Sequence, residues 1–345
     1  MKLYEITITP QSVFGTPLKG DTLFGSFCWQ AAHNPDILTG GLDQWIACYH
    51  ERPCAIFSSA WPKFYDGKTK TFLYALKRPD MPLSWLFPST GKDKASCIAA
   101  RKDNQEKKWM LVYADLTFTI PGAVCNSDKD LIQYAANLFY DPLASRMTQV
   151  SFLKEHELQH NTISRLTMTT GEAPFVPYSV EIFSYVPQTK LAIFVLIDEA
   201  ATSIDKVKCA LERIGAFGYG RDASTGCGRF TIEECNEIHI RRSNANNACY
   251  ALGPVVPEPD VWQDAYYSPF TRFGRHGDEL ATAANPFKNP VIMADEGAVF
   301  IPKKPEDILN RPYIGRAVTE ISKTLPKAVQ QGYTVYLPFR LEANQ

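Results

Sequence analysis

Two stretches of the sequence hold residue types that could do chemistry, and the first has the spacing of a zinc site. Residues 156–160 are HELQH. On a helix, His156 and His160 would lie one turn apart on one face, where two imidazoles can bind Zn²⁺. Glu157 would be placed to activate a zinc-bound water, and Glu181 offers a distant third ligand. This pattern is typical of zinc peptidases.

The residues around this motif argue against a zinc peptidase. Lys154, Glu155 and Gln159 make the segment strongly polar, whereas a catalytic zinc helix is buried at the base of a cleft. Ile163 stands where the longer zinc-peptidase pattern requires glycine. A five-residue pattern with two free positions also arises by chance. We therefore expect no metal site here.

The second stretch is rich in glycine. Residues 213–230 are RIGAFGYGRDASTGCGRF, and five glycines stand at 215, 218, 220, 226 and 228. Glycine costs conformational entropy on folding, so the backbone here must pass where a side chain would obstruct it. No G-K-[ST] follows, as a phosphate-binding P-loop requires, and the stretch follows a predicted helix rather than a strand, unlike a dinucleotide-binding fingerprint.

Two interpretations of this glycine-rich loop remain open on the residues alone. In the first, bare amides approach phosphates, with Arg221 and Arg229 as charged partners and Ser224 and Thr225 as hydroxyl donors. Tyr219 could then stack on a base. In the second, the loop is a tight structural connection and its arginines bind no ligand.

The elements that must position these residues follow from the hydrophobic pattern. Alternating and β-branched residues predict strands over residues 2–9, 54–59, 162–169, 178–186, 190–197 and 229–234. Three- and four-residue spacings predict helices over 42–49, 129–140, 148–158 and 203–214, besides a first helix with Asp21 as its N-cap. Without insertions the order is strand–helix–strand–strand–helix–strand, that of a ferredoxin-like or RRM-like α+β fold.

Two further segments depart from that order. Residues 61–121 are interrupted by prolines, carry a basic run over 92–108 and continue into a strand-like stretch over 109–120. We interpret them as an inserted β-hairpin or arm within an N-terminal domain of residues 1–240. The glycine- and proline-rich residues 253–290 and a predicted strand over 332–341 then belong to a second domain, residues 241–345.

Length, charge and cysteine usage limit the class of protein. A chain of 345 residues is long enough for about two domains. Its 36 basic and 37 acidic residues exclude a polybasic coat protein, but a local basic stripe is enough to bind nucleic acid. None of its nine cysteines stands in a C-x-x-C spacing, and the longest apolar run has seven residues. We expect a cytoplasmic protein with reduced cysteines and no membrane association.

The glycine-rich loop, GYGRDASTGxGRF, resembles that of the RAMP superfamily of CRISPR-associated proteins. Three other segments agree with the superfamily in order along the chain: LKGDTLFGSFCW at 18–29, HNTISRLTMTTGE at 160–172 and NPFKNPVIMADEGAVF at 285–300. The motifs span nearly the whole chain. Together they are most similar to the subunits that cap the guide RNA in type III-A (Csm) interference complexes.

This resemblance implies a fold and a function. The fold would be two ferredoxin-like domains, with a β-hairpin thumb inserted in the first. The function would be a non-catalytic, RNA-binding one, in which the subunit holds the repeat-derived 5′ handle of the CRISPR RNA (crRNA) without a cofactor. It would bridge the large polymerase-like signature subunit to the backbone RAMP subunit and meet target RNA only indirectly.

The resemblance also implies site residues. The handle-binding loop carries over onto Gly218, Gly220, Arg221, Ser224, Thr225, Gly226, Gly228 and Arg229. Cys227 departs from the family, because relatives commonly have a lysine there. His160, Asn161 and Arg165 would face the RNA groove beside the loop, although His160 is equally a structural histidine. Lys19, in the opening loop, is a further candidate.

An enzyme of the same superfamily is the alternative. A metal-independent endoribonuclease that processes CRISPR RNA precursors needs a general base near a 2′-hydroxyl and an acid for the leaving oxygen. His33, His160 and Tyr219 are candidates for these roles. His33 is equally well explained as a histidine that interacts with the dipole at the end of the first helix.

Overall fold

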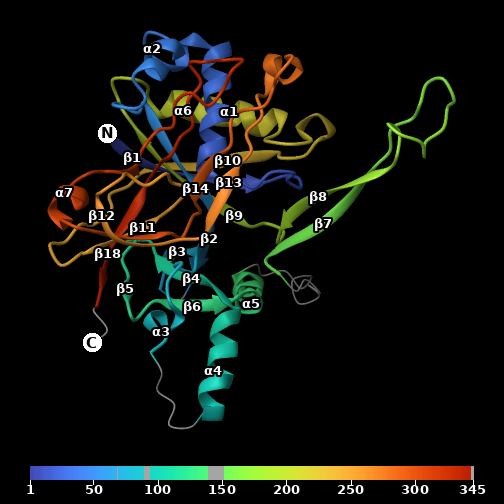
Figure 1. Cartoon of the computed structure of the whole chain (residues 1–345). Coiled ribbons are helices and arrows are strands. Elements are labelled where there is room, and N and C mark those ends of the chain that lie inside the picture. The colour runs from blue at the N-terminus through green and yellow to red at the C-terminus, as the bar shows by residue number, and fades with distance from the viewer. Residues whose placement is uncertain (68, 89–93, 139–150, 343–345) are drawn as a thin grey trace.

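The computed structural model describes residues 1–67, 69–88, 94–138 and 151–342, and it shows an α+β fold with mostly antiparallel sheets (Figure 1). The larger sheet has seven strands in the order β10-β1-β9-β2-β3-β4-β6. Their bounds are β1 (Lys2–Pro10), β2 (Ala55–Asp66), β3 (Thr71–Lys77), β4 (Lys107–Tyr113), β6 (Val124–Ser127), β9 (Lys190–Ile197) and β10 (Phe230–Glu237).

Four of these strands and two helices give the predicted βαββαβ order. β1 leads through α1 (Gly20–His33) to β2, and β9 leads through α6 (Ile204–Phe217) to β10. α1 and α6 pack against each other over this part of the sheet (Figure 1). α6 buries Val207, Ala210, Leu211 and Ile214, which recur at the three- and four-residue steps of one helical face. The strand and helix predictions for these elements are confirmed.

The smaller sheet has five strands in the order β12-β15-β11-β18-β5. Their bounds are β5 (Thr119–Ile120), β11 (Ala248–Ala251), β12 (Trp262–Tyr266), β15 (Val299–Pro302) and β18 (Tyr336–Leu341). A βαββαβ unit needs two helices, whereas the described residues beyond 240 contain one α-helix, α7 (Pro305–Leu309), and the 3₁₀ turn η4 (Asp278–Thr282). A second ferredoxin-like unit is therefore not evident in the element order.

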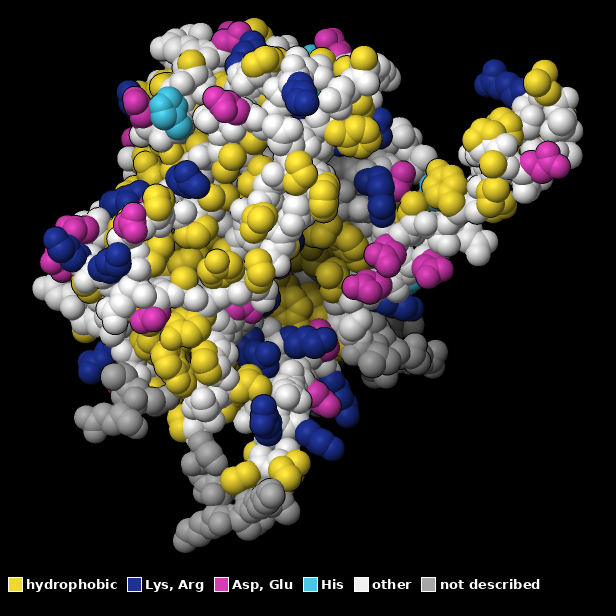
Figure 2. Space-filling model, viewed as in Figure 1, with side chains coloured by type: hydrophobic (Ala, Val, Ile, Leu, Met, Phe, Trp, Pro, Cys, Tyr) yellow, Lys and Arg dark blue, Asp and Glu magenta, His cyan; other side chains and the backbone are white. Residues whose placement is uncertain are grey.

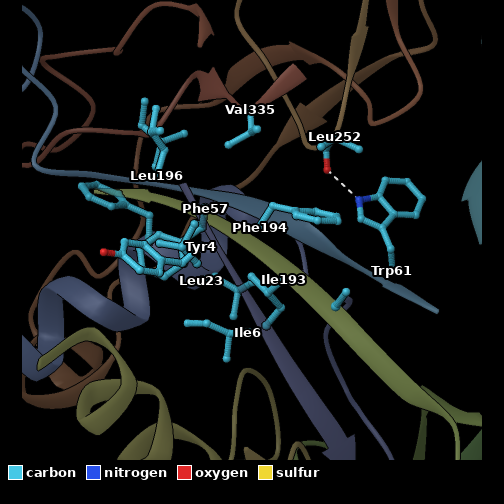
Figure 3. Packing of buried hydrophobic residues seen from close by; sticks show 14 of the residues in the cluster. Tyr4, Ile6, Leu23, Phe57, Trp61, Ile193, Phe194, Leu196, Leu252 and Val335 are labelled. Carbon is cyan, nitrogen blue, oxygen red and sulfur yellow. Dashed lines mark hydrogen bonds between the residues drawn. The ribbon is translucent and has the colours of Figure 1, made fainter. Parts of the chain in front are cut away.

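The two sheets share one hydrophobic core. Phe57, Phe194 and Leu196 of the larger sheet lie below Val335 of the C-terminal segment (Figure 3), and all four are buried in one cluster. The indole Nε1 of Trp61 donates a 3.0 Å hydrogen bond to the carbonyl of Leu252 across the junction. Because β9 is covered on both faces, its residues from Leu191 to Ile197 are apolar throughout rather than alternating.

Three two-stranded ribbons complete the structure. They are β7 (Leu153–His160) with β8 (Tyr178–Tyr185), β13 (Pro269–Arg272) with β14 (Val291–Ala294), and β16 (Ile314–Gly315) with β17 (Tyr333–Thr334). The first projects far from the body (Figure 1). The other helices are α2 (Leu42–Ala47), α3 (Leu83–Leu86), α4 (Lys94–Glu106) and α5 (Asp128–Leu138), with 3₁₀ turns η1 (Pro35–Ile37) and η3 (Ala223–Thr225).

The projecting hairpin corrects two predictions. The helix predicted over 148–158 is wrong, because its described part leads into strand β7; residues 148–150 lie outside the described part of the chain. Pairing with β8 over eight residues overrides the helix propensity of KEHELQ. The strand predicted over 162–169 is also wrong. There the chain turns at the hairpin tip, where the Ser164 amide donates to the Thr169 carbonyl and Met168 to Ser164.

The segment 61–121 does not form a separate arm. β3 and β4 pair with each other, as a hairpin would, but β3 also pairs with β2 and thereby extends the seven-stranded sheet. Most of the basic run forms α4, which lies between β3 and β4 along the chain and projects from the sheet (Figure 1). Residues 92 and 93 lie outside the described ranges. The expected hairpin arm is thus mainly an extension of the sheet.

The start of α1 differs from the predicted cap. Lys19, not Asp21, occupies the N-cap position. Asp21 lies buried in the first turn, where Arg272 Nε and Nη2 donate to its carboxylate at 2.7 and 3.0 Å. Gly20 lies so close to β2 that a Cβ there would stand 2.0 Å from the Phe57 carbonyl oxygen. The KGD sequence therefore docks α1 closely onto the sheet.

None of the helices in the described ranges has the length and apolar character needed to cross a bilayer.

Candidate nucleic-acid interface

The glycine-rich loop begins where α6 ends and folds back on itself. Its backbone has positive φ at Gly218, Gly220, Gly226 and Gly228, and also at Asp222. The Tyr219 amide donates to the Gly228 carbonyl at 2.9 Å, and the Gly228 amide donates to the Val13 carbonyl at 2.7 Å. The glycines thus allow a compact double turn.

Much of the loop's donor capacity is used inside the protein. The amides of residues 219, 225, 226, 227 and 228 donate to carbonyls, and those of Arg221 and Arg229 donate to Thr16 and Ser12 hydroxyls. Within the described residues, the amides still open are those of Gly220, Asp222, Ala223 and Ser224. The loop is therefore a tight connection, and phosphate binding by its remaining amides stays a prediction.

Tyr219 does not support the stacking prediction. Its ring is 1% exposed, and its hydroxyl hydrogen-bonds with the Thr22 hydroxyl and the Pro17 carbonyl. Burial raises the pKa of the Tyr219 hydroxyl, against the opposing effect of Thr22. The ring cannot meet a base, because it fastens the loop to the first turn of α1.

A Tyr219→Phe substitution tests this role. We expect it to lower the free energy of unfolding by about 1 kcal/mol, because it removes one buried hydroxyl and its hydrogen bonds to Thr22 and Pro17. The affinity for single-stranded RNA should stay within twofold of wild type, since no base contacts the ring. Urea denaturation and fluorescence anisotropy measure the two quantities. A large loss of RNA affinity without a loss of stability would restore the stacking interpretation.

The two arginines of the loop lie at its surface in different states. Arg221 Nη2 donates to the Glu181 carbonyl of β8, and its Nε lies 3.4 Å from the Asp222 carboxylate. Arg229 is exposed and its backbone groups bond to Ser12 and Gln11, while its side chain has no hydrogen bond or ion pair within the described part of the chain. Ser224 and Thr225 are exposed beside them. Arg221 thus joins the loop to the hairpin, while Arg229 is free to bind an anion.

Three segments meet around these side chains. Phe14 and Phe183 exchange backbone hydrogen bonds of 2.8 and 2.9 Å, which fix the loop after β1 against the base of β8. The Thr16 hydroxyl accepts the Arg221 amide at 2.9 Å. We call residues 11–16, residues 218–229 and the base of β8 the loop surface. It combines hydroxyls, open amides and guanidinium groups, which suit a sugar–phosphate backbone.

Three other residues predicted to face RNA, His160, Asn161 and Arg165, lie away from the loop surface, on the hairpin. His160 is opposite Tyr178, three residues or ~10 Å along β8 from the residue that Arg221 contacts. Its ring stacks on that of Tyr178, with centroids 5.3 Å apart, and its buried Nε2 has no hydrogen-bond partner among the residues that the structure describes. Asn161 and Arg165 are exposed at the outer end. A ligand that reached all of them would have to follow the length of the hairpin.

The hairpin has an acidic stem and an apolar outer end. Glu155, Glu157 and Glu181 are exposed along the stem. Figure 2 shows acidic side chains near its base and apolar ones toward its tip. The exposed apolar residues are Leu158, Ile163, Leu166, Met168, Val176 and Tyr178.

The HELQH motif lies on strand β7 and not on a helix. Residues four apart on a strand are separated by ~13 Å, so His156 and His160 cannot share one ion. The His156 Nε2 instead hydrogen-bonds with the Ser184 hydroxyl at 2.8 Å. Across the described ranges, no group of three or more potential ligands is arranged to hold a metal.

Lys19 does not face an RNA groove. Its ammonium forms ion pairs with Asp295 and, at 3.3 Å, with Glu296, in a junction between the two sheets. Burial opposes the charge on Lys19, but the two carboxylates outweigh it and raise its pKa. Burial raises the pKa of Glu296 to about 7, while Lys19 favours its charged form. The Lys19 prediction is therefore corrected to a structural role.

The pH dependence of stability tests this junction. An unfolded glutamate loses its proton near pH 4.5, whereas folded Glu296 keeps it to about 7, so its ionisation destabilises the fold as the pH rises between these values. Glu296→Gln removes this loss. As the pH is raised from about 4.5 to 8, we expect the free energy of unfolding of the variant to increase by roughly 1–3 kcal/mol relative to that of wild type. Parallel profiles in urea denaturation would show that Glu296 does not titrate in this range.

The three candidate acid–base residues do not converge. Tyr219 contacts Thr22 near the start of α1, whereas His33 lies eleven residues or ~16 Å further along that helix and pairs with Asp278. His160 is on the hairpin. The structure therefore brings together no pair of these groups on one reacting bond.

The sequence did not reveal Ser12 and Thr16, which hold the loop from the neighbouring segment. The strand pairing indicates their role. Pro10 pairs with Phe230, so the residues after β1 must lie close to the residues before β10.

The fold is similar to that of chains in type III-A CRISPR complexes. A chain of the "Csm3-Csm4 subcomplex in the type III-A CRISPR-Cas interference complex" superposes with a TM-score of 0.56 at 15% identity, over 99% of this chain and 100% of that one. Chains of the Csm1-Csm4 cassette in complex with pppApA and with cA4 give TM-scores of 0.51 and 0.52, at 15% and 14% identity over the full length of both. No protein-family model and no curated protein matches the chain. The likeness to Csm4-containing structures agrees with the motif resemblance at the level of fold.

Proposed function

We propose that this protein is an RNA-binding subunit of a type III CRISPR effector complex and that it holds the repeat-derived 5′ handle of the crRNA. The observation that carries the proposal is the loop surface. Its exposed Ser224, Thr225 and Arg229 stand beside open backbone amides, on a loop fixed from three sides. Such a surface suits a sugar–phosphate backbone held in one register.

The partners of the proposed subunit follow from its structural relatives. Those relatives are chains from complexes of Csm4 with Csm3 and of Csm4 with Csm1. We propose that this chain likewise bridges a backbone RAMP subunit and a large signature subunit in the cytoplasm, and meets target RNA only through the crRNA. Its formal net charge of −1 fits a protein that binds a few nucleotides and gives most of its surface to protein neighbours.

The proposed role is non-catalytic. Cleavage of RNA needs a base and an acid on either side of one phosphodiester. Among the candidates, Tyr219 is buried and His33 is paired with Asp278 on another part of the molecule. These placements support binding without cleavage.

We further propose that the chain divides near residue 240 into two domains. The seven-stranded sheet uses only strands up to residue 237, and the five-stranded sheet uses strands from 248 onward together with the short β5. The first unit has the order expected of a ferredoxin-like domain and carries the glycine-rich loop. The C-terminal unit would be a ferredoxin-like domain whose helices are reduced, and the β7–β8 hairpin would be the inserted thumb.

Affinity purification from the native host tests the proposal. We expect the tagged protein to bring down crRNAs that share one 5′ repeat-derived sequence, together with a large subunit and a backbone subunit. RNA sequencing and mass spectrometry identify them. Recovery of the protein without any crRNA would contradict the proposal. Incubation with labelled repeat RNA in EDTA is the companion assay, because specific cleavage would favour the endoribonuclease.

A further inference from the structure

The β13–β14 ribbon and its extension over residues 273–288 present one face to the body of the protein and the other to solvent. Beyond β13, the His276 amide donates to the Pro286 carbonyl and the Lys288 amide to the Gly274 carbonyl, both at 2.8 Å. Phe270, Arg272, Gly274 and His276 are buried or partly buried on the inner face. Thr271, Phe273 and Arg275 alternate with them and are exposed.

The outer face of this ribbon is aromatic. Phe273 is 77% exposed and Phe287 is 64% exposed, and Ile292 of β14 is 71% exposed. Arg275 is opposite Phe287 in an isolated bridge, with its guanidinium 5.9 Å from the ring centroid. Phe273 lies two residues before Arg275 on the same face. Large apolar side chains this exposed and this close together indicate a surface that binds something.

The ribbon is fixed to the same helical turn as the glycine-rich loop. On its inner face, Arg272 binds Asp21 through Nε and Nη2, and the Lys19 ammonium lies 4.8 Å from the Phe270 ring centroid. Thr22, the next residue of α1, hydrogen-bonds with Tyr219 of the loop. The aromatic face and the loop surface are therefore both anchored to the first turn of α1 through neighbouring residues.

The chemistry of this face matches unpaired bases. A phenyl ring with an exposed face stacks on any base, and a guanidinium beside it adds an attraction for both base and phosphate. The loop surface offers hydroxyls, amides and guanidinium groups for the backbone of the same strand, whereas the ring of Tyr219 is buried. The two surfaces thus supply complementary halves of single-strand recognition.

We propose that Phe273 and Phe287 stack on unpaired bases of the RNA whose backbone the glycine-rich loop binds, with Arg275 supporting Phe287. This inference rests on the proposed function, and it adds base contacts that the loop does not make. Ile292 lies on the same ribbon but has no ring that could stack on a base. A substitution of Ile292 therefore distinguishes stacking by a ring from general apolar contact.

The experiment measures binding of single-stranded, repeat-derived RNA from the host's CRISPR locus, with 2-aminopurine placed at successive positions. We expect Phe273→Ala combined with Phe287→Ala to weaken binding by at least about tenfold and to restore the fluorescence that stacking quenches at one or two positions. Phe→Tyr at both positions should retain affinity and quenching, while Phe→Leu should lose both. Ile292→Ser is the matched control and should bind as wild type does. Because all three residues are exposed, circular dichroism should show the same fold in every variant.

Several outcomes would overturn the inference. Unchanged binding by the double alanine variant, with weakened binding by a variant that lacks Arg221 and Arg229, would reject the stacking face and leave the proposed function intact. Unchanged binding by both would reject the proposed function as well. Equal losses for Ile292→Ser and the alanine variants, or full affinity with leucine, would show that ring stacking does not hold the RNA here and would reject the inference.

Discussion

Gly228→Ala is expected to disrupt the glycine-rich loop and to lower the free energy of unfolding by about 3 kcal/mol or more. Gly228 has φ of +75°, where an L-residue costs ~1–2 kcal/mol. Its new Cβ would stand 2.1 Å from the Tyr219 carbonyl oxygen and 2.5 Å from the Tyr219 nitrogen, both of which are backbone atoms. The loop would have to open, so the exposed side chains would lose their register. Urea denaturation measures the stability, and anisotropy with labelled handle RNA measures the binding.

Gly226→Ala is the matched control in the same loop. Gly226 also has positive φ, at +99°, but a Cβ there would meet no atom within 4 Å among the described residues. Only the backbone strain remains, so we expect a loss of ~1–2 kcal/mol and RNA binding close to wild type. Equal losses of stability in the two variants would show that the close approach of Gly228 to Tyr219 does not contribute to the free energy of unfolding.

Arg221→Ala combined with Arg229→Ala is expected to weaken binding of handle RNA by at least about a hundredfold, since each charged hydrogen bond contributes about 1.5–3 kcal/mol. Two fewer phosphate contacts should also reduce the slope of log affinity against log salt by about 1.4, at ~0.7 for each contact on a single strand. Filter binding over a series of salt concentrations measures both quantities.

Two further variants show where this effect arises. Arg213→Ala removes an exposed arginine of α6 outside the loop surface and should leave both affinity and slope unchanged. Arg229→Ala alone should remove one phosphate contact. It should not disturb the hairpin, because the arginine that bonds to the Glu181 carbonyl is Arg221. If the double variant bound as wild type does at every salt concentration, the loop surface would not be the RNA site.

The sequence predicted those strands and helices whose own residues show a clear hydrophobic pattern. The alternation of KLYEITIT and the helical spacing of Val207, Ala210, Leu211 and Ile214 are local, and the structure confirms β1 and α6. The strand β7 could not be found in this way, because KEHELQH is polar on both faces and becomes a strand only by pairing with β8. The segment 61–121 was misjudged for a related reason. Whether a hairpin stands free or extends a sheet depends on the partner of β3, which lies in β2.

The candidate site was predicted in composition but only partly in geometry. The glycines predicted a backbone in unusual conformations, and positive φ at Gly218, Gly220, Gly226 and Gly228 confirms this prediction. The sequence could not show that Tyr219 points inward or that Lys19 is neutralised by carboxylates almost 280 residues away. Burial and long-range ion pairs are properties of the packed chain. They decided which polar residues remain available to a ligand.

The position of β18 bears on the order in which the chain can fold during synthesis. β18 lies between β11 and β5 in the five-stranded sheet, yet it is made of residues 336–341, about 85 residues after β11. Until it emerges from the ribosome, the wholly buried residues of β11 have an open edge and nothing to cover it. The seven-stranded sheet has all its strands by residue 237, so these strands can pair first. The nascent protein would therefore pass through a partly folded stage with an unpaired strand edge, to which a chaperone can bind.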